Sequence, residues 1–137
     1  DPKYIPKMIN LYLKNSLDIV IGSRPLTKGP NNGLTETRRL ASKILIYFFL
    51  VFNIKTSDPM SGYFLFNKNI YVKNKKYFFG KGFKILADFL INSKKSLKTE
   101  DYLINFKRRY GDKSKMNFKI LFILMQFYFI SLIKKFI

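Results

Sequence analysis

The stretch Asp18-Ile19-Val20-Ile21-Gly22-Ser23-Arg24 decides how the rest of this chain is interpreted. A short apolar run that stops at Gly22-Ser23 is typical of a buried strand, because glycine lets the backbone leave a sheet at angles that other residues avoid. Arg24 is then expected just past the carboxyl end of the strand. Ligands bind at that edge of open α/β sheets, which makes Arg24 a candidate binding residue.

A turn-rich loop over residues 25–33 follows this strand, and the next helix is predicted to run to about Phe52. Arg38 and Ser42 are four residues apart, so they share one face of that helix. With Arg24 they predict a pocket of two guanidinium groups and one hydroxyl, a set that suits the oxygens of a phosphate. A basic surface loop without a ligand is the alternative.

The remaining elements alternate between helix and strand. Apolar residues recur at helical spacing over 7–13 and again over 82–91. Strands are predicted at 63–66, directly after a turn, and at 98–106. The chain is therefore predicted to form an α/β domain.

Two polar loops carry further candidate residues. In Ser57-Asp58-Pro59-Met60-Ser61-Gly62, Asp58 is kept out of the helical region by the following proline, and Gly62 is free to take an unusual backbone angle. The second loop, from Arg108 to Lys115, packs four cations into eight residues. A solvated basic loop before a helix is the alternative interpretation of this second segment.

Composition narrows the possible chemistry. The 137 residues fit one small domain, and the start at Asp1 without an initiator methionine predicts a fragment or a processed chain. Cysteine and histidine are absent, which excludes disulfides, a thiolate nucleophile and a histidine base. The formal charge of +18, among 18% aromatic residues, predicts an anionic partner: nucleic acid, a phospholipid surface or a phosphorylated substrate.

Two apolar segments, 44–52 and 120–133, are shorter than the span of about 20 residues that crosses a bilayer. The first is expected to be buried in protein or half-sunk in a membrane surface. The second has lysines at both ends, which suits a helix at the membrane interface. A core helix of an incomplete domain, or the start of a true membrane segment in a longer chain, are the alternatives for it.

Several of these segments, in this order, resemble the C-terminal half of a polyprenyl-phosphate glycosyltransferase of the dolichol-phosphate mannose synthase type. The segments are Asp1-Pro2 with Ile5-Pro6, Asp18 to Arg24, Arg38 with Ser42, Ser57 to Tyr63, Gly82 to Leu86 with Asp88, and Arg109 to Lys115. The resemblance implies the acceptor-side half of an inverting, Rossmann-like GT-A domain over residues 1–115. Residues 116–137 would form an apolar membrane-associated helix.

The resemblance also implies three groups of site residues. The catalytic group at the lipid phosphate is Arg24, Arg38 and Ser42. The group on the acceptor side is Asp58, Ser61 and Gly62, with Pro59 shaping the turn. The group at the donor diphosphate is Arg109, Ser114 and Lys115. Gly111 stands one residue closer to Arg109 than the family spacing has it, so Arg108 is the alternative to Arg109.

The function implied is transfer of a hexose, mannose or glucose, from GDP-mannose or UDP-glucose to a dolichyl or undecaprenyl phosphate. A lipid phosphate is already an anion, so the reaction needs cations to hold two phosphate groups and does not need a base. A divalent metal, Mg²⁺ or Mn²⁺, is expected in the whole enzyme, with its ligands before Asp1, and the chain alone is expected to be inactive.

The implied setting is the cytoplasmic face of a membrane, with the lipid surface as a partner and no nucleic acid. Two other functions remain open. A basic nucleic-acid-binding module would use the charge and the interleaved aromatic residues, although no recognised reading motif is present. A non-catalytic membrane-surface module would use only the apolar segments.

Overall fold

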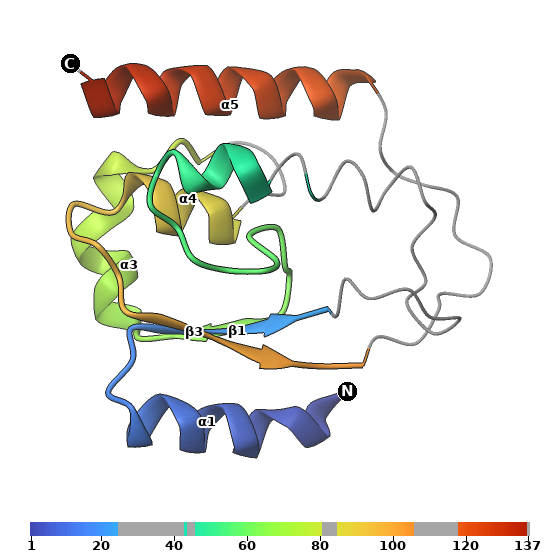
Figure 1. Ribbon diagram of the computed structural model, residues 1–137. Helices are drawn as coiled ribbons and strands as arrows, with labels where there is room; N and C mark the ends of the chain where they lie inside the picture. Colours follow the sequence, from blue (N-terminus) through green and yellow to red (C-terminus); the bar gives the residue numbers. More distant parts are fainter. Residues whose placement is uncertain (25–42, 44–45, 81–84, 106–117, 137) are drawn as a thin grey trace.

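The computed structural model describes residues 1–24, 43, 46–80, 85–105 and 118–136, and in these residues helices lie on both faces of a small sheet (Figure 1). The helices are η1 Pro2–Tyr4, α1 Ile5–Lys14, α3 Lys68–Asn74, η2 Lys75–Tyr77, α4 Ile85–Asn92 and α5 Phe118–Phe136. The strands are β1 Ile19–Ser23, β2 Phe64–Phe66 and β3 Thr99–Leu103. α1 covers one face of the sheet, α3 and α4 lie on the other, and α5 lies beyond α4.

The strand at Ile19–Ser23 is the centre of the sheet, as its apolar sequence predicts. β1 lies between β2, which runs antiparallel to it, and β3, which runs parallel to it. Every residue of β1 is buried. The α/β class predicted from the sequence is confirmed, and the sheet is mixed.

Gly22 has a different role from the one expected. It stays within the strand, and its backbone is not in the left-handed region. A Cβ atom there would lie 2.9 Å from the carbonyl oxygen of Tyr63 and 2.7 Å from the Cδ1 atom of Ile104. Glycine is therefore required because the neighbouring strand ends leave no room for a side chain, and the expectation of an unusual departure angle was wrong.

The sheet separates two apolar clusters. On one side, Ile19 and Ile21 pack against Leu86 and Phe89 of α4. On the other side, Val20 packs against Met8 of α1. Alternate residues of β1 therefore face opposite helices, which fixes the strand in its register because a shift by one residue would exchange the two faces.

α5 forms a third apolar cluster with the rest of the domain. Leu124 and Phe127 are buried against Phe49, Ile54 and Ala87. The opposite face of the helix is exposed, and its large apolar residues are Phe122, Met125, Phe129, Ile133 and Phe136. One face of α5 thus belongs to the core, and the core-helix interpretation holds for that face. Among the helices that the structure describes, none combines the length and apolar character needed to traverse a bilayer.

The helices α3 and η2 were not predicted from the sequence. Asn67 caps α3, because its side-chain oxygen accepts a hydrogen bond from the backbone N–H of Asn69 at 2.8 Å. Asparagine is a preferred N-cap residue, so this signal was available in the sequence. The lysine and asparagine residues that follow interrupt the helical spacing of apolar residues by which a helix is recognised in a sequence.

Candidate functional site

Arg24 and Asp58 meet at the carboxyl end of β1. Arg24 Nε donates to Asp58 Oδ2 at 2.8 Å, and Arg24 Nη2 donates to Asp58 Oδ1 at 3.2 Å. The two side chains form a bidentate ion pair, although they are 34 residues apart in the sequence. The sequence predicted both residues but assigned them to different groups, and the structure brings them together. The pair fixes the plane of the guanidinium at the edge of the sheet.

Burial differs between the two partners. The side chain of Asp58 is 9% exposed, and that of Arg24 is 34% exposed. A carboxylate held this far from water needs the guanidinium as its counter-charge. Arg24 therefore presents a cation at the surface, while Asp58 supports it from inside the domain.

Ser61 joins the same turn to β1. Its hydroxyl donates to the carbonyl oxygen of Gly22 at 2.6 Å and accepts the N–H of Tyr63 at 3.1 Å. Ser61 is 4% exposed, whereas Gly62 is exposed and has no atom within 4 Å of an added Cβ. Gly62 also lies outside the left-handed region, so it does not use the conformational freedom that glycine offers there. Ser61 holds the turn in place, and only Gly62 of these two offers open surface.

The other end of the turn is bound to β3. Asp101 accepts hydrogen bonds from Thr56 Oγ1 at 2.6 Å and from the backbone N–H of Ser57 at 2.8 Å. The hydroxyl of Ser57 donates to the same carboxylate at 2.5 Å. Sequence reasoning missed Asp101. The available signal was a row of two carboxylates, Glu100-Asp101, inside a predicted strand that is otherwise expected to be partly buried.

One buried hydroxyl lies next to Arg24. Ser23 is fully buried, and within the described part of the chain its Oγ has no hydrogen-bond partner. An unpaired buried hydroxyl costs stability. Such groups are uncommon in folded proteins and mark positions that warrant a functional test.

Asp88, which belongs to the motif at Gly82 to Leu86, binds the backbone of the turn that precedes α4. It is 7% exposed, and its carboxylate accepts the backbone N–H groups of Phe79 at 3.0 Å and of Gly80 at 2.9 Å. Gly80 has a φ of +68°, a left-handed conformation that glycine adopts without strain. Asp88 thus fixes the turn that leads toward α4.

The remaining site residues fall outside the described ranges. These are Arg38, Ser42, Arg108, Arg109, Ser114 and Lys115. The pocket of two guanidinium groups and the donor-diphosphate cluster therefore stay predictions. The expected division after residue 115 also falls in this part of the chain.

The described carboxylates do not suit a metal site. Asp58 is bound to Arg24, and Asp101 is bound to Thr56 and Ser57. Across residues 1–24, 43, 46–80, 85–105 and 118–136, no group of three or more acidic side chains is placed to hold a metal ion. The Mg²⁺ or Mn²⁺ expected for a whole enzyme stays an expectation about residues beyond these.

Comparison with known proteins gives one similarity and one negative result. No family model matches the chain. The dolichol-phosphate mannosyltransferase of Pyrococcus furiosus is 34% identical over 126 residues, which cover 88% of this chain and 34% of that protein. The chain spans about a third of the length of the curated relative it matches. Along most of its own length, the chain is therefore similar to part of a protein named as a glycosyltransferase.

Proposed function

We propose that this chain is the acceptor-phosphate part of a glycosyltransferase that moves a hexose from a nucleotide sugar to a polyprenyl phosphate. The observation that carries the proposal is the oriented guanidinium of Arg24 at the carboxyl end of β1. The similarity to the Pyrococcus dolichol-phosphate mannosyltransferase supports it, since that protein is named for a lipid phosphate and a hexose.

The chemistry asks little of the protein beyond positioning. The phosphate oxygen of the acceptor attacks the anomeric carbon of the sugar, and the bond to the nucleotide diphosphate breaks. The acceptor is anionic at neutral pH, so no residue has to remove a proton. The rate then depends on holding two phosphate groups close together and on stabilising the departing diphosphate.

Arg24 would bind the acceptor phosphate, with Arg38 and Ser42 completing the pocket. Asp58 holds the guanidinium in a fixed plane, so less conformational freedom is lost when the phosphate binds. Arg109 or Arg108, with Ser114 and Lys115, would bind the donor diphosphate. A divalent metal in the whole enzyme would neutralise further charge on that diphosphate. The 137 residues alone would be inactive, because the metal and nucleotide sites would lie elsewhere.

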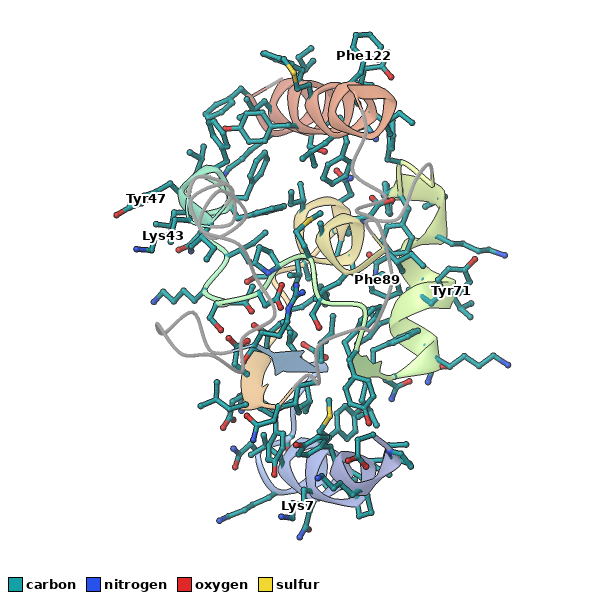
Figure 2. All side chains as sticks on the ribbon, turned by 90° about the vertical axis from the view of Figure 1, so that its right-hand side faces the viewer. Lys7, Lys43, Tyr47, Tyr71, Phe89 and Phe122 are labelled. Carbon is teal, nitrogen blue, oxygen red and sulfur yellow. The ribbon has the colours of Figure 1, made fainter. Side chains whose placement is uncertain are left out.

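The exposed apolar surfaces suit a membrane that carries the polyprenyl tail. Phe48, on the helical turn of residues 46–50, contacts Tyr128 of α5 with ring centroids 4.9 Å apart, so the two helical segments adjoin. Tyr47 and Phe122, from these two segments, point away from the domain (Figure 2). Lys134 and Lys135 at the end of α5 would add attraction to anionic lipid on the cytoplasmic face, reduced by the bonds that their amino groups already donate to the carbonyl oxygens of Tyr77 and Val51.

The experiment is a transfer assay on the full-length protein that contains this chain. GDP-mannose and UDP-glucose are supplied as donors, and a short polyprenyl phosphate is the acceptor. Arg24→Ala is expected to lower kcat/KM for the acceptor by about 10- to 100-fold, since it removes a charged hydrogen-bond partner of the phosphate. Lys7→Ala is the matched control, because it removes the same charge from the exposed end of α1 (Figure 2).

Other results would contradict the proposal. Absence of transfer from either donor, with lipid binding unaffected by Arg24→Ala, would favour the non-catalytic membrane-surface module. Binding of single-stranded nucleic acid that weakens steeply with salt, without binding to vesicles, would favour the nucleic-acid module instead.

A further inference from the structure

We propose that Asp101 is a positioning residue for Arg24, acting through the turn that carries Asp58; as a statement about the reaction, this rests on the proposed function. Asp101 lies in the middle of β3, where it pairs in register with Ile21 of β1. Its carboxylate contacts neither Arg24 nor any other cation among the hydrogen bonds and ion pairs described here. Within the described part of the chain, its hydrogen bonds come from the two residues that precede Asp58.

The hydrogen bonds form a continuous series from β3 to the end of β1. Thr56 Oγ1 donates to Asp101 Oδ1 at 2.6 Å and accepts the backbone N–H of Asp58 at 3.3 Å. Asp58 then binds Arg24 through both carboxylate oxygens. The Thr56 hydroxyl has one donor and one acceptor role, and the carboxylate of Asp101, which can only accept, fixes which way that hydroxyl points.

The second oxygen of Asp101 fixes the backbone of the turn. Oδ2 accepts both the N–H and the hydroxyl of Ser57, at 2.8 and 2.5 Å. At the far end of the turn, Ser61 binds the carbonyl oxygen of Gly22. The turn is therefore held at one end by β3 and at the other by β1. Without the β3 contact, the turn would keep one anchor and could rotate about it.

This arrangement has a cost that a purely structural turn need not bear. The half-buried carboxylate of Asp101 exchanges part of its hydration for hydrogen bonds from three neutral donors. A loop could be anchored by backbone bonds or by apolar packing at lower desolvation cost. The three bonds instead fix the position and orientation of Asp58, and hence the plane of the guanidinium. A displacement of about 1 Å at a phosphate contact is enough to reduce the rate greatly.

The test compares variants that keep the shape of the side chain and change its bonding. Asp101→Asn turns one acceptor oxygen into a donor that opposes either Thr56 or Ser57. Thr56→Val removes the hydroxyl between Asp101 and Asp58, while Thr56→Ser retains it and is the matched control. In the full-length enzyme, Asp101→Asn and Thr56→Val are expected to lower kcat/KM for polyprenyl phosphate by about tenfold with the donor KM unchanged. Thr56→Ser is expected to stay near the parent.

A double-mutant cycle separates positioning from general structure. If Asp101 acts through Arg24, Asp101→Asn causes no further loss in an Arg24→Ala background. Equal losses in both backgrounds, or a raised donor KM, would overturn the proposal. So would Thr56→Ser behaving like Thr56→Val.

An NMR measurement tests the positioning of Arg24 without relying on the sugar-transfer assay. The Nε–H NMR signal of Arg24, assigned with Arg24→Lys, is expected to shift and to exchange faster with water in Asp101→Asn and Thr56→Val but not in Thr56→Ser. An unchanged signal in the first two variants would refute the positioning role. If the signal responds as expected and no sugar is transferred, the positioning role stands and the proposed function fails.

Discussion

Gly22 is the residue on which the site is most tightly built. An added Cβ would meet backbone at 2.9 Å, and backbone cannot move aside as a flexible side chain can. The same residue supplies the carbonyl oxygen that anchors Ser61 and the N–H that donates to Tyr63 at 2.8 Å. Close approach of three chain segments therefore depends on the absence of a side chain at this position.

Gly22→Ala is expected to lower the free energy of unfolding by about 1–3 kcal/mol, because the methyl group overpacks a junction of backbone segments. Gly62→Ala is the matched control, since its added methyl group meets nothing within 4 Å and its backbone lies outside the left-handed region. The control should change stability by less than about 0.5 kcal/mol. Urea denaturation measures both, and equal losses would show that the packing at Gly22 is not the cause.

The pairing of Arg24 with Asp58 shows where sequence reasoning stops at this scale. Arg24 was predicted from local chemistry, as an arginine after a buried strand, and Asp58 from the family resemblance of its turn. That they bind each other depends on β2 folding back antiparallel beside β1, which brings the turn to the strand end. Asp101 lies a further 43 residues along the chain from Asp58. No local sequence pattern predicts contacts between residues that are so far apart in the sequence.

At the scale of elements, α5 has two faces with different environments. Phe127 is 2% exposed and lies 5.7 Å from Phe79, centroid to centroid. Phe129, two residues away, is 57% exposed. Lys134 and Lys135 attach the end of the helix by donating to the carbonyl oxygens of Tyr77 and Val51. The helix is therefore fixed to the domain along one face and at its end.

Phe127→Ala is expected to cost about 3–5 kcal/mol of unfolding free energy, because it leaves a cavity among Phe79, Phe49 and Ala87. Phe129→Ala removes the same ring from the open face and should cost less than about 1 kcal/mol. Thermal denaturation of the two variants gives the comparison. A large loss for Phe129→Ala would mean that this face is covered in the intact protein.

The elements were predictable where apolar spacing was clear. The helix predicted over 7–13 and the strands predicted around Val20 and Leu65 are confirmed, and the strand predicted over 98–106 is confirmed as β3, which ends at Leu103. α5 is longer than the apolar segment 120–133 and lies within the helix expected over 116–137. α3 was not predicted because its apolar residues form one short run at 70–72 between polar residues, which shows no helical period, although Ile70 and Tyr71 pack toward Phe89.

At the scale of the whole molecule, charge and apolar surface combine. The formal charge of +18 is distributed over a chain whose α5 exposes a row of aromatic and aliphatic side chains. Charge alone would suit any polyanion. The apolar face favours the proposed lipid surface over nucleic acid, because a bilayer buries such side chains.

The chain is expected to bind phosphatidylcholine vesicles weakly and vesicles that also contain phosphatidylserine more strongly. Salt should weaken only the added binding, since it screens charge and leaves apolar insertion intact. Vesicle sedimentation measures both terms. The double variant Phe122→Ser with Phe129→Ser should reduce binding to the neutral vesicles. The double variant Lys7→Ser with Lys14→Ser, on α1, is the comparison and should leave binding to neutral vesicles unchanged. Complete loss of all vesicle binding at high salt would argue against apolar insertion.

The order of the strands also sets the time at which the turn at Asp58 can gain both of its anchors. β1 is synthesised before its parallel partner β3, which lies 80 residues later, since Ile19 pairs with Thr99. Parallel pairing at such separation forms slowly, because a long loop must close before the contacts can form. Asp101 is on that last strand, so the turn at Asp58 gains its second anchor only when β3 has joined the sheet. Arg24 is thus made before Asp58 and Asp101, and its surroundings are complete only once β3 has joined the sheet.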